Sequence, residues 1–164
     1  MSGKAWKFRD NISTDEISPG RFMSLRSNLP ELAKHTLEDA RKEFPLEVKQ
    51  GDFVVAGSNF GMGSSREQAP LVIKMCGVRA VLAKSFARIF YRNAINIGMP
   101  VIICDTSRID EGDILELDLS SSKVVDKTKG IELTFPRMSK TMEAILAEGG
   151  LLAYVEKYGD LLLA

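Results

Sequence analysis

The sequence is poor in residues that bind metals. Its 164 residues include two cysteines, Cys76 and Cys104, and a single histidine, His35. Two cysteines cannot build a disulfide framework, and they are fewer than the roughly three or four thiolates that hold an iron–sulfur cluster. A Ser-His-Asp triad or a histidine-based zinc site could be built only around His35, so both are disfavoured. We therefore expect reduced, packed thiols, no metal site and no cofactor bound by this chain.

An excess of one charge and a long apolar run are also missing. Lysine plus arginine number 22 and aspartate plus glutamate also 22, so no basic excess exists to release counterions from a phosphate backbone. No apolar run approaches the roughly 20 residues of a membrane-spanning helix, and the first ten residues lack the apolar segment of a signal peptide. We expect no nucleic acid, no membrane contact and a cytoplasmic location.

What the sequence does contain is typical of a globular protein. Hydrophobic residues make up 45% and charged residues 27%, with 13 glycines and 6 prolines, which argues against disordered, collagen-like or coiled-coil chains. The length is that of one domain with one main core. We predict a single domain over residues 1–164.

The middle of the chain alternates between strand and helix patterns. Short apolar runs predict strands at 52–56, 79–83 and 100–104. Between them, apolar residues at helical spacing predict one helix that ends at Gly77 and another at 86–97. Strand, helix, strand, helix, strand predicts an α/β layer with right-handed crossovers.

The flanking segments add strands and helices to this layer. The predicted elements are a short strand at 6–8 followed by a polar loop, a surface loop at 19–28, a helix at 29–44, strands at 114–119, 123–127 and 131–135, and one or two helices over 138–159, interrupted at Gly149 and Gly150. The three late strands are joined by polar turns, which predicts an antiparallel addition. The fold class is therefore α/β, a mixed sheet with flanking helices.

A glycine-rich segment lies between a predicted strand and a predicted helix. Gly57, Gly61 and Gly63 let backbone N–H groups converge at the helix start, where the helix dipole favours an anion. A Walker A loop would need lysine where Ser64 stands, and a dinucleotide fingerprint would need glycine or alanine where Arg66 stands. Both nucleotide interpretations lack their diagnostic residue.

The residues after these glycines suit a carboxylate ligand. Arg66 could bind a carboxylate through two hydrogen bonds. The hydroxyl of Ser64 or Ser65, held among positive partial charges, has a stabilised alkoxide and could act as a general base without histidine. The alternative is that Ser64 or Ser65 caps the helix, Glu67 completes the capping arrangement and Arg66 is solvated. Spacing alone leaves both interpretations open.

Three blocks of sequence resemble one known family. DNISTDEISPGR at 10–21, GSNFGMGSSREQAP at 57–70 and RAVLAKSFARIFYRNAINIGMP at 79–100 look like the corresponding blocks in small subunits of 3-isopropylmalate dehydratase and their relatives, in the aconitase superfamily. The blocks occur in the same order and at similar separations as in that family. The resemblance covers nearly the whole chain.

The resemblance implies a fold, a partner and a reaction. It implies a swivelling β/β/α domain of the aconitase C-terminal type that closes over a large subunit carrying a [4Fe-4S] cluster, in a heterodimer or heterotetramer. The implied reaction is a dehydration and rehydration that moves a hydroxyl between adjacent carbons of a malate-type acid, as in leucine biosynthesis. By position, Ser64 resembles the catalytic base, and Ser65 and Arg66 resemble residues that bind the substrate carboxylate.

The resemblance implies that the loop after the PGR segment determines substrate choice. The sequence of this loop differs here from the pattern that is common in the family. Phe22, Met23 and Leu25 would suit an alkyl group, whereas Arg26 would suit an extra carboxylate, as in homoaconitate. The alternative is that the apolar residues pack under the loop and Arg26 is solvated. We favour 3-isopropylmalate as substrate, with homoaconitate or a dimethylmalate-type acid as alternatives. A carboxylate-binding regulatory module without catalysis is the non-enzyme alternative.

Several further polar residues have two interpretations. Those that either shape the substrate-side loop or simply form turns are Asp10, Asn11, Thr14 and Asp15. Those that either brace the glycine-rich segment or meet the partner subunit are Lys84, Ser85 and Arg88.

Overall fold

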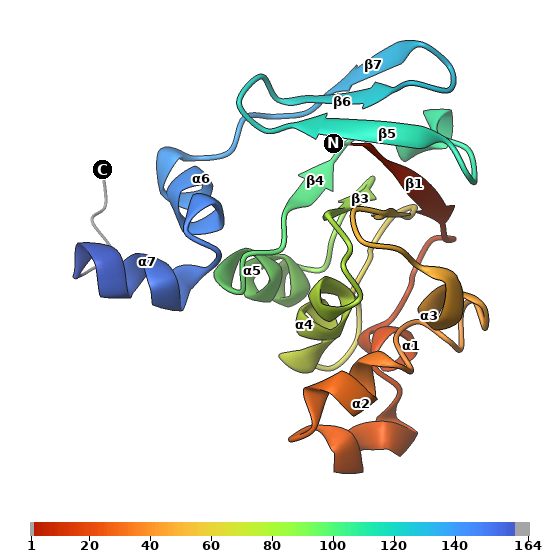
Figure 1. Ribbon diagram of the computed structural model, residues 1–164, viewed down its shortest axis with the longest axis vertical. Coiled ribbons are helices and arrows are strands. Elements are labelled where there is room, and N and C mark those ends of the chain that lie inside the picture. Colours follow the sequence, from red (N-terminus) through yellow and green to blue (C-terminus); the bar gives the residue numbers. More distant parts are fainter. Residues whose placement is uncertain (1, 160–164) are drawn as a thin grey trace.

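A computed structural model describes residues 2–159 of the chain (Figure 1). Within them, the strands form one mixed sheet in the order β4-β3-β2-β1-β5-β6-β7. The strands are β1 (Ser2–Lys7), β2 (Phe53–Val55), β3 (Ala80–Ala83), β4 (Val101–Ile103), β5 (Ile114–Asp118), β6 (Lys123–Asp126) and β7 (Ile131–Thr134). Strands β1 to β4 run parallel, and β5 to β7 are antiparallel, as their patterns predict.

The two halves of the sheet meet at β1. This strand pairs in parallel with β2, where Trp6 lies opposite Val54, and antiparallel with β5, where Lys4 lies opposite Ile114. Successive side chains of a strand point to opposite faces. Val54 therefore packs in one buried cluster, whereas its neighbours Phe53 and Val55 pack in another.

The two buried clusters lie on opposite faces of the parallel strands. Phe53 and Leu82 pack against Leu115 and Val124 from the antiparallel strands, which curl over that face. The other face is covered by helices (Figure 1). The resulting β/β/α layering confirms the expected fold class.

The helices are short, and most of them lie on the face of the sheet that is not covered by the antiparallel strands. The α-helices are α1 (Thr14–Ile17), α2 (Leu29–Ala33), α3 (Phe44–Glu47), α4 (Gln68–Met75), α5 (Arg88–Asn96), α6 (Lys140–Ala147) and α7 (Leu151–Tyr158), with 3₁₀ helices at Gly20–Leu25 and Thr106–Arg108. Gly77 has a φ of +86° and follows α4 directly, and Gly149 and Gly150 separate α6 from α7, as predicted. Within residues 2–159, every helix is too short or too polar to span a bilayer.

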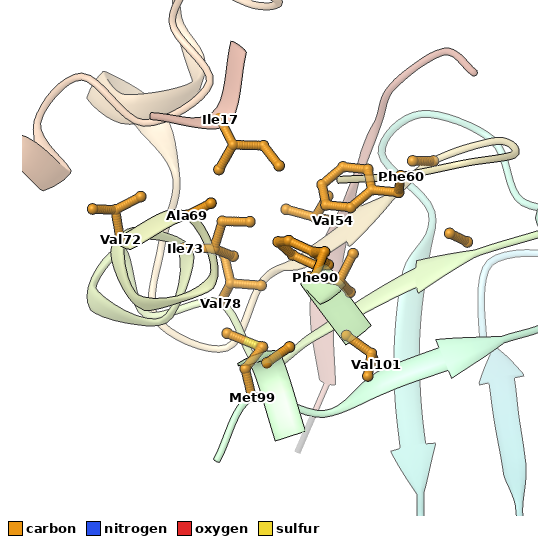
Figure 2. Close-up of a cluster of buried hydrophobic side chains, with 14 of the residues drawn as sticks. Ile17, Val54, Phe60, Ala69, Val72, Ile73, Val78, Phe90, Met99 and Val101 are labelled. Carbon is orange, nitrogen blue, oxygen red and sulfur yellow. The ribbon is translucent and has the colours of Figure 1, made fainter. Parts of the chain in front are cut away.

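The helical face holds a core that reaches into the glycine-rich segment (Figure 2). Phe60, which lies between the glycines, is fully buried, and its ring meets the Phe90 ring edge-on with centroids 5.2 Å apart. Val54 of β2 and Ile73 of α4 are fully buried in the same cluster. Burying one such side chain contributes about 1.5–3 kcal/mol. The segment is therefore anchored from inside the core.

The single helix predicted at 29–44 is wrong. The structure has α2, a run of turns and then α3, because Leu37 adopts a φ of +57° and leaves the helical path. There its backbone N–H donates to the Ile17 carbonyl at 3.0 Å, and its side chain is fully buried. In this segment, turns place apolar side chains in the core at the same sequence spacing that an amphipathic helix would have.

The two loops predicted before residue 29 also contain helices. The loop after the first strand includes α1, whose start carries a capping box: Ser13 accepts from the Glu16 N–H, and the Glu16 side chain reaches back to the Ser13 N–H. The segment 19–28 contains the 3₁₀ helix Gly20–Leu25. Helices this short do not repeat often enough to produce a period in the sequence.

Candidate active site

The glycine-rich segment, residues 57–67, leaves the carboxyl end of β2 and leads into α4. Residues of the 10–21 block run beside it. The Gly61 N–H donates to the Ile12 carbonyl at 2.8 Å, and the Thr14 N–H donates to the Met62 carbonyl at 2.8 Å. The Thr14 hydroxyl donates to the Ser64 carbonyl at 2.7 Å. These bonds hold the backbone in place up to Ser64.

Two glycines are required for the close contact of the glycine-rich segment with Asp10 and Phe90. The Asp10 carboxylate accepts from the Ser58 N–H at 2.6 Å, and a Cβ on Gly57 would lie only 1.7 Å from the same carboxylate oxygen. Gly61 has a φ of +85°, and a Cβ there would lie 2.3 Å from Cγ of Phe90. Any side chain at either position would push the segment away from its supports.

The other edge of the segment rests on the residues after β3. The Asn59 N–H donates to Oγ of Ser85 at 2.7 Å, and the Phe60 N–H donates to the Ser85 carbonyl at 3.1 Å. The Ala87 N–H donates to the Phe60 carbonyl at 2.9 Å. Ser85 therefore braces the glycine-rich segment, which was one of its two predicted roles.

Arg66 is tied to the 10–21 block. Its Nη1 lies 3.0 Å from Oδ1 of Asp15 and donates to the Ser18 carbonyl at 2.6 Å. The Arg66 side chain is only 18% exposed, against 63% for Asp15. A Cβ on Gly20 would lie 2.9 Å from Oδ1 of Asp15 and 3.3 Å from Nη2 of Arg66. Glycine at position 20 therefore leaves room for the ion pair, and Arg66 is held rather than solvated.

Ser64 and Ser65 are exposed and lie ahead of the helix. Helix α4 begins at Gln68, its cap position is Glu67, and no side chain caps it. The alternative in which Ser64 or Ser65 caps the helix is therefore wrong. Within the described residues, the Ser64 hydroxyl has no hydrogen-bond partner, so it is free to meet a ligand.

A cavity of about 210 Å³ adjoins these residues. Its lining includes Ser64, Ser65 and Arg66 from the glycine-rich segment, and Arg88 and Asn93 from α5. Two guanidinium groups and two hydroxyls around a small cavity favour a carboxylate. A serine alkoxide is also stabilised by nearby positive charge.

The segment after the PGR sequence is divided between the surface and the core. Arg26 lines a groove of about 560 Å³ together with Met23, Ser65 and Arg66. Phe22 does not line it: its ring stacks on His35 with centroids 3.7 Å apart. Leu25 is half-buried against the helical core. The structure thus brings Arg26, but neither Phe22 nor Leu25, to the groove beside Ser65 and Arg66.

The two thiols lie apart from this site. Burial and the neighbouring Asp105 raise the pKa of Cys104 to about 12, and burial raises the pKa of Cys76. Cys104 packs on the face covered by strands, Cys76 on the face covered by helices. Among the described residues, no three His, Cys, Asp or Glu side chains are grouped as a metal would require. Two protonated thiols on opposite faces do not fit an iron–sulfur cluster.

Sequence reasoning missed part of the site. The sequence predicted no role for Ser18 or Asn93. It predicted only a turn or a loop-shaping role for Thr14 and Asp15, and only a bracing or partner-contact role for Arg88. All five lie inside the blocks 10–21 and 79–100 that carry the family resemblance. The blocks therefore located the site, but nothing local in them identified these contacts.

Comparisons with known proteins agree with this fold. The aconitase C-terminal domain family matches residues 4–105. The 3-isopropylmalate dehydratase small subunit 2 of Archaeoglobus fulgidus is 62% identical over 161 residues, covering 98% of both chains. The small subunit 1 of Thermotoga maritima is 53% identical over 98% of this chain and 97% of its own.

A solved structure matches over almost the same length. The crystal structure of 3-isopropylmalate dehydratase (LeuD) from Methanocaldococcus jannaschii superposes with a TM-score of 0.91 at 48% identity, covering 96% of this chain and 94% of that one. The family match covers more than half of the chain, and the relatives match nearly all of it. The chain therefore belongs to the aconitase C-terminal domain family, in the group of 3-isopropylmalate dehydratase small subunits.

Proposed function

We propose that this chain is the small subunit of a 3-isopropylmalate dehydratase, a hydro-lyase of leucine biosynthesis that is active only with a large subunit. The observation that carries the proposal is the cavity at Ser64, Ser65 and Arg66, in a chain that matches such a small subunit over 98% of its length. The reaction removes water from a malate-type acid and adds it back with the hydroxyl on the adjacent carbon.

Ser64 is the general base of this proposal. Its alkoxide takes the proton from the carbon next to a carboxylate, and the electron pair of that C–H bond forms the new C=C bond. The hydroxide expelled from the adjacent carbon takes up a proton and leaves as water. Ser65 and Arg66 bind the carboxylate and stabilise the negative charge that develops on it. The bonds from Arg66 to Asp15 and to the Ser18 carbonyl support this role, because they hold the guanidinium beside the serines before substrate arrives.

The cluster belongs to the partner in this proposal. Cys76 and Cys104 do not fit an iron–sulfur cluster, so we assign a [4Fe-4S] cluster to the large subunit. A heterodimeric or heterotetrameric complex, a cytoplasmic location and a single domain over residues 1–164 remain predictions.

The residues 22–26 decide the substrate in this proposal. Met23 and Arg26 line the groove beside Ser65, whereas Phe22 and Leu25 pack outside its lining. The apolar side chains that line the groove favour the alkyl group of 3-isopropylmalate; they are Met23, Leu29, Leu71 and Ile97. Contact of Arg26 with a further carboxylate would instead favour homoaconitate, and a dimethylmalate-type acid is the third candidate.

Reconstitution tests the function. The chain is mixed with the cluster-loaded large subunit of the same organism, and dehydration of 3-isopropylmalate, homoaconitate and dimethylmalate is followed. We expect turnover only with both subunits and the highest kcat/KM with 3-isopropylmalate. Binding of these acids without any turnover would favour the non-enzyme alternative, a regulatory module.

We predict that Arg66→Lys lowers kcat/KM by about tenfold or more although the charge is kept. A lysine ammonium is a point charge, so it cannot hold Asp15, the Ser18 carbonyl and a substrate carboxylate together as a planar guanidinium can. Steady-state kinetics of the reconstituted complex measure the loss. Arg9→Lys is the control, because Arg9 is exposed and, among the residues described, its side chain pairs only with Glu16 at 2.7 Å. Equal kinetics for both variants would remove Arg66 from the site.

A further inference from the structure

A second guanidinium lines the cavity at Ser64. Arg88 is the first residue of α5, is exposed, and makes no ion pair or hydrogen bond within residues 2–159. Arg66 differs, because the Asp15 carboxylate 3.0 Å away balances its charge. The uncompensated positive charge at this cavity is therefore that of Arg88.

The backbone at Arg88 is fixed relative to the glycine-rich segment. The preceding residue, Ala87, donates its N–H to the Phe60 carbonyl at 2.9 Å. Two residues later, Phe90 is 2% exposed and packs directly beneath Gly61. Helix α5 also has no side-chain cap, so its first N–H groups add positive partial charge on the same side. Arg88 is thus anchored at the wall of the cavity.

We propose that Arg88 binds the second carboxylate of the dicarboxylic substrate, while Ser65 and Arg66 bind the first. This inference rests on the proposed function. A malate-type acid carries two carboxylates, and enclosing either one without a cationic partner is costly. Arg88 is the cation that remains free for it in the small cavity of about 210 Å³. The first turn of α5 then completes substrate recognition from the side opposite the 10–21 block.

The test measures affinity for a dicarboxylate in the complex with the large subunit. Calorimetry with 3-isopropylmalate gives the dissociation constant, and steady-state kinetics give KM and kcat. We expect Arg88→Ala to weaken binding about 10- to 100-fold, the usual effect of losing a charge-assisted hydrogen bond, and to change KM more than kcat. Arg88→Lys should recover part of the affinity, which a merely structural role would not predict.

Arg92→Ala is the matched control. Arg92 is exposed one turn further along α5 and does not line the cavity, so its loss should change the dissociation constant less than about twofold. If Arg88→Ala binds 3-isopropylmalate as tightly as wild type, or if both variants weaken only subunit association, the inference is overturned.

Failure of the proposed function has a different signature. A wild-type complex that binds 3-isopropylmalate without turnover contradicts the function, while the affinity of Arg88→Ala still decides the role of Arg88. A wild-type complex that binds no dicarboxylate overturns both.

Discussion

Replacing Ser64 by alanine should cut turnover of the reconstituted complex by about 10² to 10⁴-fold, the usual contribution of a general base. Folding and association with the large subunit should remain nearly intact. The Ser64 hydroxyl is exposed and has no partner within the described residues, so its removal breaks no internal bond. The Ser64 backbone keeps its bond from the Thr14 hydroxyl. Turnover, thermal unfolding and subunit titration measure the three quantities.

Proton exchange separates a lost base from a displaced substrate. Wild type should exchange the proton next to the substrate carboxylate with deuterated solvent, and Ser64→Ala should lose this exchange even at saturating substrate. Ser65→Ala is the companion variant and should act mainly on KM, because we assign Ser65 to binding. If Ser64→Ala kept more than about half of wild-type turnover, the base would have to be another group.

Replacing Gly61 by alanine should lower the free energy of unfolding by about 2–5 kcal/mol. Two costs combine, because the φ of +85° strains any L-residue and the new Cβ would lie 2.3 Å from Cγ of Phe90. Phe90 is 2% exposed and packed against Phe60, so its ring cannot move aside freely. Denaturant unfolding measures the loss, and the displaced segment should also lower activity.

Gly63→Ala separates the two costs. Gly63 has a φ of +99°, but a Cβ there would find its nearest neighbour, Oγ1 of Thr14, at 3.5 Å. It therefore carries backbone strain without overlap and should cost only about 1–3 kcal/mol. Equal losses at Gly61 and Gly63 would show that the contact with Phe90 does not limit the segment.

The parts of the fold predicted correctly are those whose signals are local. The strands of the parallel layer are short apolar runs bounded by turns, and Gly77 ends α4 where expected. The helix predicted at 29–44 failed because a distant partner decides that region. Leu37 leaves the helical conformation, and there its side chain is buried and its N–H donates to the Ile17 carbonyl. Neither of these contacts can be inferred from the sequence around Leu37.

The candidate site divides in the same way. Glycines between a strand and a helix mark Ser64, Ser65 and Arg66 because the chemistry and the spacing lie in one short segment. The bonds from Arg66 to Asp15 and Ser18 join parts of the chain about fifty positions apart. No periodicity or turn preference encodes such a pair. The structure excludes the helix cap at Ser64 or Ser65 through the place where α4 begins, and helix boundaries are the least reliable part of sequence reasoning.

Strand β1 precedes both of its neighbours in the sheet along the chain, and it precedes β5 by a long stretch. Ala5 pairs with Phe53 of β2, whereas Lys4 pairs with Ile114 of β5, which lies more than a hundred positions downstream. Contacts between residues so distant in sequence form slowly, and an unpaired strand edge can join another chain in the meantime. During translation β1 therefore stays unpaired along the edge that meets β5 until Ile114–Asp118 has emerged, and the two halves of the sheet can join only after that.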